Sequence, residues 1–290
     1  MKQLTYEAHA KINLTLDVTG RLENGYHTVE MVMQSIGLHD NVTVTAETGT
    51  GAIEVTTTSG SLPNDKSNLA YRAAELFFSE LSLPNSGIAI HIEKNIPIAA
   101  GLAGGSTNAA AVLCALNELY HCQCSKDQLA AMGVKLGADI PFCIYGGTML
   151  ASGIGEQLTR LPAAPQCAVV LCKPPVSVST PAIYREMDRV EIAEHPDTQA
   201  VCEAIRTGSY AGLCAGLCNV MQPVTGGWHP EVLEIRQTLL DCGADGAVMS
   251  GSGPSTFGLF SDPDAAQRAY NALKARYADT FLTDFFDPMD

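Results

Sequence analysis

The pattern of apolar and polar residues predicts a group of strands in the N-terminal part of the chain. Residues 3–19 and 29–58 are rich in Thr, Val and Ile, and they alternate in part between apolar and polar side chains. β-Branched residues with a period of two are typical of strands. A further strand is expected in "GIAIHIEKNIP" (87–97), just before a glycine-rich loop.

Three segments between residues 67 and 137 show the spacing of amphipathic helices instead. "SNLAYRAAELFFSEL" (67–81) starts with a Ser or an Asn that can cap a helix. A second helix is expected to follow the glycine-rich loop and to run to about Tyr120. "SKDQLAAMGVKLG" predicts a third, with Ser125 as its N-cap, and residues 137–161 are expected to return to turns and strands.

The second half of the chain mixes strands and helices. It predicts a strand over 167–173, several helices, two short strands joined by a glycine turn in "GAVMSGSGPSTFGLF" (246–260), and a final helix and strand. The proline-rich "LPAAPQ" (161–166) is typical of a surface connection near a domain boundary. We therefore expect an α+β protein of two lobes, with domains over 1–155 and 156–290.

Composition and charge exclude several classes of function. The 290 residues carry a formal net charge of −14 without a Lys/Arg-rich run, which argues against binding to nucleic acid. Apolar runs such as "CAVVLC" (167–172) are no longer than strands, and the N-terminus lacks the apolar core of a secretory signal. We expect a cytoplasmic protein that does not bind membranes, either a monomer or a weak homodimer.

The ten cysteines do not form a CxxC pair, and most lie among apolar neighbours. We expect reduced, packed thiols rather than disulfides or a zinc site.

The loop "PIAAGLAGGSTNAA" (97–110) is the strongest candidate for chemistry. Glycines at the start of a helix let phosphate oxygens approach unpaired backbone N–H groups at the positive end of the helix dipole. Ser106 and Thr107 can cap the helix, bind a phosphate oxygen or ligate Mg²⁺. The spacing is neither a Walker A motif nor a dinucleotide fingerprint. The alternative is a stretch of small residues that packs a helix closely onto a sheet.

The spacing Pro97-x-x-x-Gly101-Leu102-x-Gly104-Gly105-Ser106-Thr107 resembles the phosphate-binding motif of the GHMP kinases (galactokinase, homoserine, mevalonate and phosphomevalonate kinases). Two further segments resemble that family's other motifs in the expected order. They are "AHAKINLTLDVTGRLENGYHTVEMVMQSI", near the N-terminus, and "SGSGPSTFGLF", whose glycine turn at Gly251 and Gly253 is expected to pack against the loop. The resemblance extends from residue 8 to about 260.

The resemblance implies a two-lobe kinase fold, with the nucleotide lobe at the N-terminus and ATP and Mg²⁺ as cofactors. Asp139 would accept the proton of the substrate hydroxyl, and Lys11 would pair with it. The alternatives from the residues alone are that Asp139 caps a turn and that Lys11 lies at a strand edge or on the surface. The implied ATP-binding residues are Pro97, Ile98, Ala99, Ala100, Gly101, Leu102, Ala103, Gly104, Gly105, Ser106, Thr107, Asn68 and Lys94, with Ser106 also near the metal.

Three segments resemble one member of this family, whose substrate is a small alcohol with a cytidine group. They are "RLENGYHTVEMVMQSI", "KLGADIPFCIYGGTMLASGIGEQL" and "KPPVSVSTPAIY". The match implies substrate contacts for Asn13, Tyr26, His27, Thr180 and Tyr184, with His27 on the cytosine edge and Tyr184 stacked on the base. Asn13 can instead be a buried structural amide, and Thr180 is also expected to cap a helix.

The loop departs from the family pattern at three alanines. Ala103 stands where the family usually has Gly, and Ala99 and Ala100 also replace small or glycine residues. Ala103 fits this position if its φ is negative.

Two other functions remain open on this evidence. One is a kinase of the same superfamily with another substrate, such as homoserine or mevalonate. The other is a nucleotide sensor on an inactive kinase fold. The histidines at 9, 39, 91, 121, 195 and 229 have no partner pattern and are expected to be structural.

Overall fold

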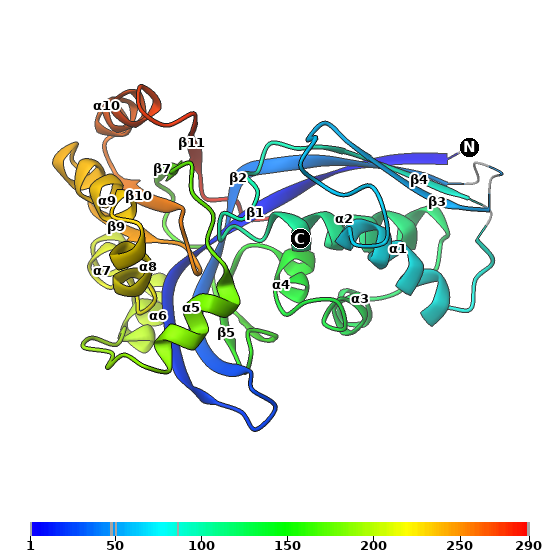
Figure 1. Ribbon diagram of the computed structural model, residues 1–290, viewed down its shortest axis with the longest axis horizontal. Coiled ribbons are helices and arrows are strands. Elements are labelled where there is room, and N and C mark those ends of the chain that lie inside the picture. Colours follow the sequence, from blue (N-terminus) through cyan, green and yellow to red (C-terminus); the bar gives the residue numbers. More distant parts are fainter. Residues whose placement is uncertain (1, 47–48, 50, 86, 289–290) are drawn as a thin grey trace. The chain divides into compact units, whose positions relative to one another are not determined.

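The computed structural model describes residues 2–46, 49, 51–85 and 87–288 (Figure 1). Residues 47, 48 and 50, which belong to the expected run of strands, lie outside this part. The strands are β1 Lys2–Arg21, β2 His27–Ala46, β3 Ile53–Thr57, β4 Ile88–Glu93, β5 Thr148–Ser152, β6 Gln157–Arg160, β7 Ala168–Lys173, β8 Cys218–Asn219, β9 Gly246–Met249, β10 Thr256–Phe260 and β11 Asp279–Asp284. The helices are α1 Leu69–Glu80, α2 Gly104–Leu119, α3 Lys126–Gly133, α4 Ile140–Tyr145, α5 Thr180–Met187, α6 Thr198–Arg206, α7 Tyr210–Ala215, α8 Gln222–Trp228, α9 Glu231–Asp241 and α10 Pro263–Lys274.

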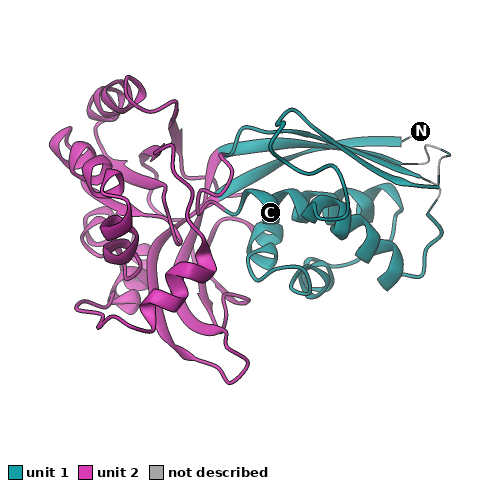
Figure 2. Cartoon of the chain, viewed as in Figure 1, with its two compact units in different colours: residues 1–10, 38–96, 103–145 teal, residues 11–37, 97–102, 146–290 magenta. Residues whose placement is uncertain are grey.

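The chain forms two compact units that are interleaved along the sequence (Figure 2). Unit 1 contains residues 1–10, 38–96 and 103–145, and unit 2 contains residues 11–37, 97–102 and 146–290. The long strands β1 and β2 contribute to both units. The units therefore do not follow one boundary after residue 155, because a 20-residue strand is long enough to serve two cores. The division into domains 1–155 and 156–290 stays a prediction.

Unit 1 is a sheet with helices α1 to α4 on one face (Figure 2). Strand β4 pairs with β2 in antiparallel register and with β3 in parallel register. Val42, Val44, Ile90 and Ile92 alternate toward the helices, and the small residues of α1 and α2 let these helices approach the sheet closely. The opposite face carries polar pairs, such as the hydroxyls of Thr5 and Thr43.

The capping signals in the sequence place two of these helices correctly. Asn68 caps α1 and accepts a hydrogen bond from the Ala70 N–H, while Ser125 and Gln128 form a capping box at α3. Helix α4 was not predicted, because six residues are too few to show a helical apolar period.

Unit 2 contains a second sheet in the order β11–β7–β10–β9. Strands β9 and β10 are antiparallel, with Thr256 opposite Met249, and the glycine turn between them is the one that the sequence predicted. Helices α9 and α10 cover this sheet, with Ile235, Leu239 and Leu273 in the core. Elsewhere in unit 2, β1 pairs with β8, and β2 pairs with β5, which pairs with β6.

Within the described residues, every helix is too short or too polar to span a bilayer. The same part of the chain contains all ten cysteines, each as a free thiol. Burial raises the pKa of Cys114 to about 11 and that of Cys167 to about 12. These two thiols stay protonated at neutral pH and act as apolar packing groups.

Candidate active site

The glycine-rich loop ends at the first turn of α2, which begins at Gly104. Ala103 is the N-cap residue and gives the helix no side-chain cap, so the expectation that Ser106 or Thr107 caps it is wrong. Both residues lie inside the first helical turn, after the N-cap position, so their hydroxyls do not cap the N–H groups at the start of the helix. A helix that begins here leaves the N–H groups of Gly104, Gly105 and Ser106 without intrahelical acceptors, as an anion site requires.

Ser106 and Thr107 differ in what their hydroxyls can still do. Thr107 is 3% exposed, and its Oγ1 donates to the His9 carbonyl at 2.8 Å. This hydroxyl therefore anchors α2 to β1. Ser106 is half-buried beside the exposed Gly105, which leaves it better placed to meet a phosphate oxygen or a metal ion.

Two alanines of the loop adopt the left-handed backbone conformation. Ala103 has φ 57° and ψ 25°, and Ala99 has φ 51°. The condition under which Ala103 was expected to fit this position, a negative φ, is therefore not met. An L-residue in this region costs about 1–2 kcal/mol because its Cβ crowds the following carbonyl oxygen. Both alanines therefore occupy a backbone conformation that glycine adopts freely.

The three motifs meet in unit 2 around Gly101. A Cβ on Gly101 would lie 2.3 Å from the Ser250 carbonyl oxygen, and the Ser250 hydroxyl donates to the Gly101 carbonyl at 3.0 Å. A Cβ on Gly251 would lie 3.4 Å from Lys11 Nζ. The glycine turn therefore packs against the loop, as predicted, and both glycines are needed because backbone approaches backbone.

Lys11 and Asn13 lie side by side on one face of β1 in unit 2. Lys11 is 5% exposed, and its Nζ donates to Asn13 Oδ1 at 2.7 Å. Asn13 Nδ2 contacts the Met31 sulfur at 3.1 Å. Lys11 is thus a buried ammonium held by an amide, and it is not the surface or edge lysine that was the alternative reading.

Asp139 belongs to unit 1 and lies in a half-buried turn directly before α4. Its carbonyl accepts a hydrogen bond from the Cys143 N–H at 3.1 Å, so the backbone of Asp139 starts the helix. The pairing of this carboxylate with Lys11 stays a prediction.

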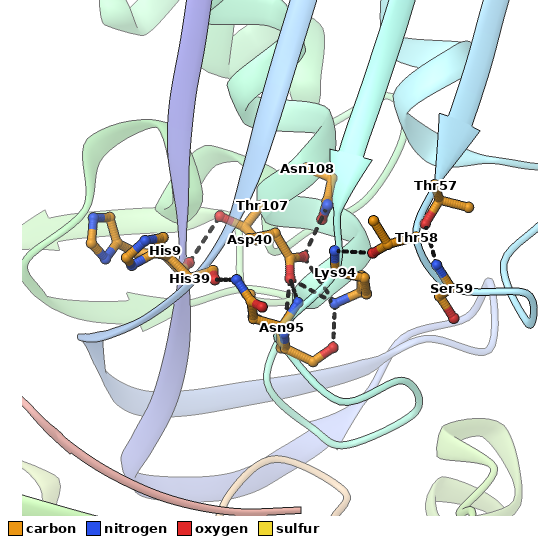
Figure 3. A network of polar contacts seen from close by, with 11 residues as sticks. His9, His39, Asp40, Thr57, Thr58, Ser59, Lys94, Asn95, Thr107 and Asn108 are labelled. Carbon is orange, nitrogen blue, oxygen red and sulfur yellow. Dashed lines mark hydrogen bonds and ion pairs between the residues drawn. The ribbon is translucent and has the colours of Figure 1, made fainter.

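A buried carboxylate that the sequence analysis missed organises the entry to the loop. Asp40 is 0% exposed and accepts from the N–H groups of Asn95 at 2.7 Å and Ile96 at 2.8 Å (Figure 3). Its other oxygen accepts from Asn108 Nδ2 at 3.0 Å. Asp40 therefore ties the segment before the loop to the helix after it.

Lys94 completes this network and has a structural partner. Its Nζ lies 2.8 Å from Asp40 Oδ2 and also donates to the Ile96 carbonyl. Burial lowers the pKa of Lys94, and the adjacent Asp40 carboxylate opposes that effect. Asn68, the other predicted adenine-pocket residue, uses its side chain as the α1 cap and as a donor to the Pro63 carbonyl. Adenine contacts for both residues stay predictions.

The predicted cytosine residues gather in unit 2. The rings of His27 and Tyr184 are stacked, with centroids 4.7 Å apart and an interplanar angle of 17°. His27 Nε2 lies 2.7 Å from Asp188 Oδ1, and this hydrogen bond holds the pKa of Asp188 below its ordinary value. Asp188 thus fixes the ring of His27, and no signal in "YREMDRV" pointed to it. Tyr26 is 61% exposed on the neighbouring turn.

Thr180 is the first residue of α5 rather than its cap. The N-cap is Ser179, one residue earlier, and the Thr180 hydroxyl lies 2.8 Å from the Ser252 hydroxyl. This contact connects α5 to the glycine turn of the third motif. Asn219, which was also missed, supports the same turn by donating from Nδ2 to the Met249 and Gly251 carbonyls, both at 2.8 Å.

A separate hollow of about 610 Å³ lies in unit 2 and is lined by Cys167, Tyr210, Phe260, Leu282 and Asp284, among others. It contains none of the predicted site residues.

Comparisons with known proteins agree with the three motifs. Residues 68–147 match the model of the GHMP kinases N terminal domain, and residues 201–279 match that of the GHMP kinases C terminal domain. The chain is 43% identical over 280 residues to the 4-diphosphocytidyl-2-C-methyl-D-erythritol kinase of Brevibacillus brevis, covering 97% of this chain and 95% of the relative. It is 46% identical over 272 residues to the kinase of the same name from Geobacillus kaustophilus, covering 94% and 93%.

Solved structures show the same relationship. The crystal structure of a 4-(cytidine 5'-diphospho)-2C-methyl-D-erythritol kinase matches with a TM-score of 0.82 and 33% identity, over 98% of this chain and all of that one. Homoserine kinase from Cytophaga hutchinsonii matches with a TM-score of 0.76 and 20% identity, over 99% and 95%, which supports the fold alone. With motifs, fold and near full-length identity in agreement, the chain belongs to the 4-diphosphocytidyl-2-C-methyl-D-erythritol kinases of the GHMP kinase superfamily.

Proposed function

We propose that this protein uses ATP to phosphorylate the 2-hydroxyl of 4-diphosphocytidyl-2-C-methyl-D-erythritol, a step of non-mevalonate isoprenoid synthesis. The observation that carries the proposal is the 43–46% identity to kinases of that name over more than nine-tenths of the chain. The stacked His27 and Tyr184 support it, since these are the two residues assigned to the cytosine.

The N-terminal turn of α2 is the proposed phosphate cradle. The N–H groups of Gly104, Gly105 and Ser106 point out of the helix at its positive end, where a triphosphate can accept hydrogen bonds. The support from Asp40 and Lys94 fixes the chain on both sides of this turn, so the amides are already oriented before ATP binds.

Mg²⁺ fits this arrangement as an ion held mainly by the phosphates, with Ser106 as the candidate protein ligand. Mg²⁺ prefers oxygen ligands and usually keeps several waters, so one hydroxyl is a sufficient contribution from this segment. When bound, the ion neutralises charge on the phosphates.

Asp139 and Lys11 are proposed to act on the substrate hydroxyl. As its oxygen bonds to the γ-phosphorus and the bond to the β-phosphate oxygen breaks, the proton passes to the Asp139 carboxylate and ADP leaves. The Lys11 ammonium stabilises negative charge on the attacking oxygen. The protein forms no bond to the phosphoryl group, so its contribution is positioning and electrostatics.

An ADP-release assay with three alcohols tests this function. We expect turnover with 4-diphosphocytidyl-2-C-methyl-D-erythritol and not with homoserine or mevalonate. Turnover of either alternative alcohol, with none of the cytidyl substrate, would identify another kinase of the superfamily. ATP binding without turnover of any alcohol would support a nucleotide sensor.

A further inference from the structure

Two histidines and a glutamate meet on the polar face of the unit 1 sheet. The side-chain hydrogen bonds Thr5–Thr43 and Gln3–Thr45 give the register of β1 and β2. A step of two residues back along β1 corresponds to a step of two residues forward along β2, as in antiparallel pairing. The same register places His9 opposite His39. Glu7 precedes His9 by two residues and therefore shares its face.

The three side chains approach one another closely. His9 Nε2 lies 3.4 Å from Glu7 Oε2, and His39 Nε2 lies 4.0 Å from Glu7 Oε1. The two imidazole centroids are 5.1 Å apart, and one ligand atom from each of the three residues lies within 4.8 Å of the others. A zinc ion with ligands at about 2.0–2.1 Å has a tetrahedral edge of about 3.4 Å. The His9–Glu7 pair already has that separation, and the His39–Glu7 pair, at 4.0 Å, has to close for His39 to provide the third ligand.

The chemistry of the donor set selects the class of ion. Imidazole nitrogens suit Zn²⁺, Ni²⁺ and Cu²⁺, whereas Mg²⁺ and Ca²⁺ prefer oxygen ligands alone. Two histidines and one carboxylate are also the protein ligands of zinc sites that keep a fourth position for water. His9 and His39 are 13% and 30% exposed in their side chains, and Glu7 is 60% exposed, so an ion can reach all three.

We propose that Glu7, His9 and His39 form a binding site for a divalent transition ion of the Zn²⁺ class. This site is separate from the Mg²⁺ of the phosphoryl transfer, and it assigns a ligand role to two histidines that the sequence left as structural.

The site is connected to the glycine-rich loop through backbone carbonyls (Figure 3). The His9 carbonyl accepts from Thr107 Oγ1, and the His39 carbonyl accepts from Asn95 Nδ2 at 2.9 Å. An ion that joins His9 to His39 would therefore hold together the two strands that support both flanks of the loop. Because such an ion binds the folded chain, it should also raise the melting temperature.

Titration calorimetry of the whole protein with ZnCl₂, in a phosphine reductant, tests the proposal. We expect the three variants E7Q, H9Q and H39Q each to weaken the same binding event at least about tenfold, since even the outer partners of metal ligands contribute 10–100-fold. The control is H91Q, which removes an exposed histidine that is bonded to Thr56 on the same unit. It should bind Zn²⁺ as the unmodified protein does.

Co²⁺ absorption separates this site from the cysteines. Binding at Glu7, His9 and His39 should give visible ligand-field bands without thiolate charge-transfer bands, and H39Q should abolish the visible bands. All three ligands lie on the solvent-facing side of the sheet, so their variants should melt as the unmodified protein does in the absence of metal. The proposal is wrong if the unmodified protein binds no Zn²⁺, or if it binds Zn²⁺ with the same affinity as H9Q and H39Q.

Discussion

Gly101 is the residue on which the geometry of the loop depends most directly. It combines φ +74° with a space in which a Cβ would lie 2.3 Å from the Ser250 carbonyl oxygen. Gly208, in the same unit, has φ +70° but nothing within 4 Å of the corresponding position. Substitution of either glycine would strain the backbone, but only substitution of Gly101 would also cause a steric clash.

We expect G101A to be far more damaging than G208A. Both substitutions introduce the left-handed strain of about 1–2 kcal/mol, but only G101A also pushes the loop away from the glycine turn. Urea unfolding should show the larger shift for G101A, and kcat/KM should fall only for that variant. Equal shifts in the two unfolding curves would mean that the turn at Ser250 moves aside without cost.

Tyr184 is the residue that tests the assignment of the cytosine. Stacking of a base on an aromatic ring contributes about 1–3 kcal/mol, so Y184A should raise KM for the cytidyl substrate roughly five- to 150-fold. Y184F should be nearly silent, because it keeps both the ring and its stacking on His27. Steady-state kinetics measure both effects, with KM for ATP as the internal control. Equal damage from Phe and Ala, or an unchanged KM in Y184A, would contradict the assignment.

At the scale of elements, the start of α2 contains strain that can be removed. Ala103 has φ 57° at the N-cap, where glycine adopts this conformation freely. We expect A103G to raise the free energy of unfolding by up to about 1 kcal/mol, because relief of strain exceeds the entropic cost of glycine.

The control for A103G is A131G, at an exposed position inside α3. The same change there should lower stability by up to about 1 kcal/mol, since the helix interior disfavours glycine. Chemical denaturation of both variants measures whether each substitution raises or lowers the free energy of unfolding. A loss of stability in A103G would show that the left-handed conformation costs little in this loop.

The Asp40 network is the second element-scale feature, because it connects β2, the segment before the loop, and α2. In D40N an amide nitrogen would face Lys94 and Asn108, both of which are donors. Breaking a buried ion pair by removing one partner costs about 3–5 kcal/mol. D40N should therefore lower the free energy of unfolding by an amount of this order and raise KM for ATP.

Two further variants define the effect of D40N. E93Q alters the exposed neighbour of Lys94 and should change stability by less than about 0.5 kcal/mol. The double variant D40N/K94M should lose less than the sum of its single variants, because it leaves no unpaired ammonium in a buried place. If D40N and E93Q unfold at the same urea concentration, Asp40 does not organise the loop.

At the scale of the whole molecule, the proposed chemistry draws on both compact units. Asp139 belongs to unit 1 and Lys11 to unit 2, while the loop residues 97–102 and 103–107 are divided between them (Figure 2). A mechanism that uses both residues on one hydroxyl predicts that the effects of substituting them are not additive.

We expect D139A to bind ATP normally and to lose about 10²–10⁴-fold in kcat, as is typical when a general base is removed. K11M should lose a similar factor, and the double variant should be little worse than either single one, because residues that act as a unit are not additive. Single-turnover rates of the unmodified protein, the two single variants and the double variant provide the double-mutant cycle that measures this. Fully additive losses would place Lys11 in a separate role.

Local signals in the sequence determined most of the elements and all three motifs. The caps at Asn68 and Ser125, the alternation in β4 and the glycine turn at 250–253 depend on neighbours within a few residues, so a linear pattern contains them. Motif spacing identified the family for the same reason, since the chemistry of a phosphate loop requires certain residue types at fixed intervals.

Only the tertiary structure decided which distant residues meet. Asp40 and Asn108 are 68 positions apart, Gly101 and Ser250 are 149 apart, and each contact depends on strand register and packing that no short segment specifies. The left-handed φ of Ala103 is also a property of the folded loop, because an L-residue rarely adopts this conformation and its residue type alone does not predict it. His9 and His39 looked unrelated in the sequence until antiparallel pairing of two long strands placed them face to face.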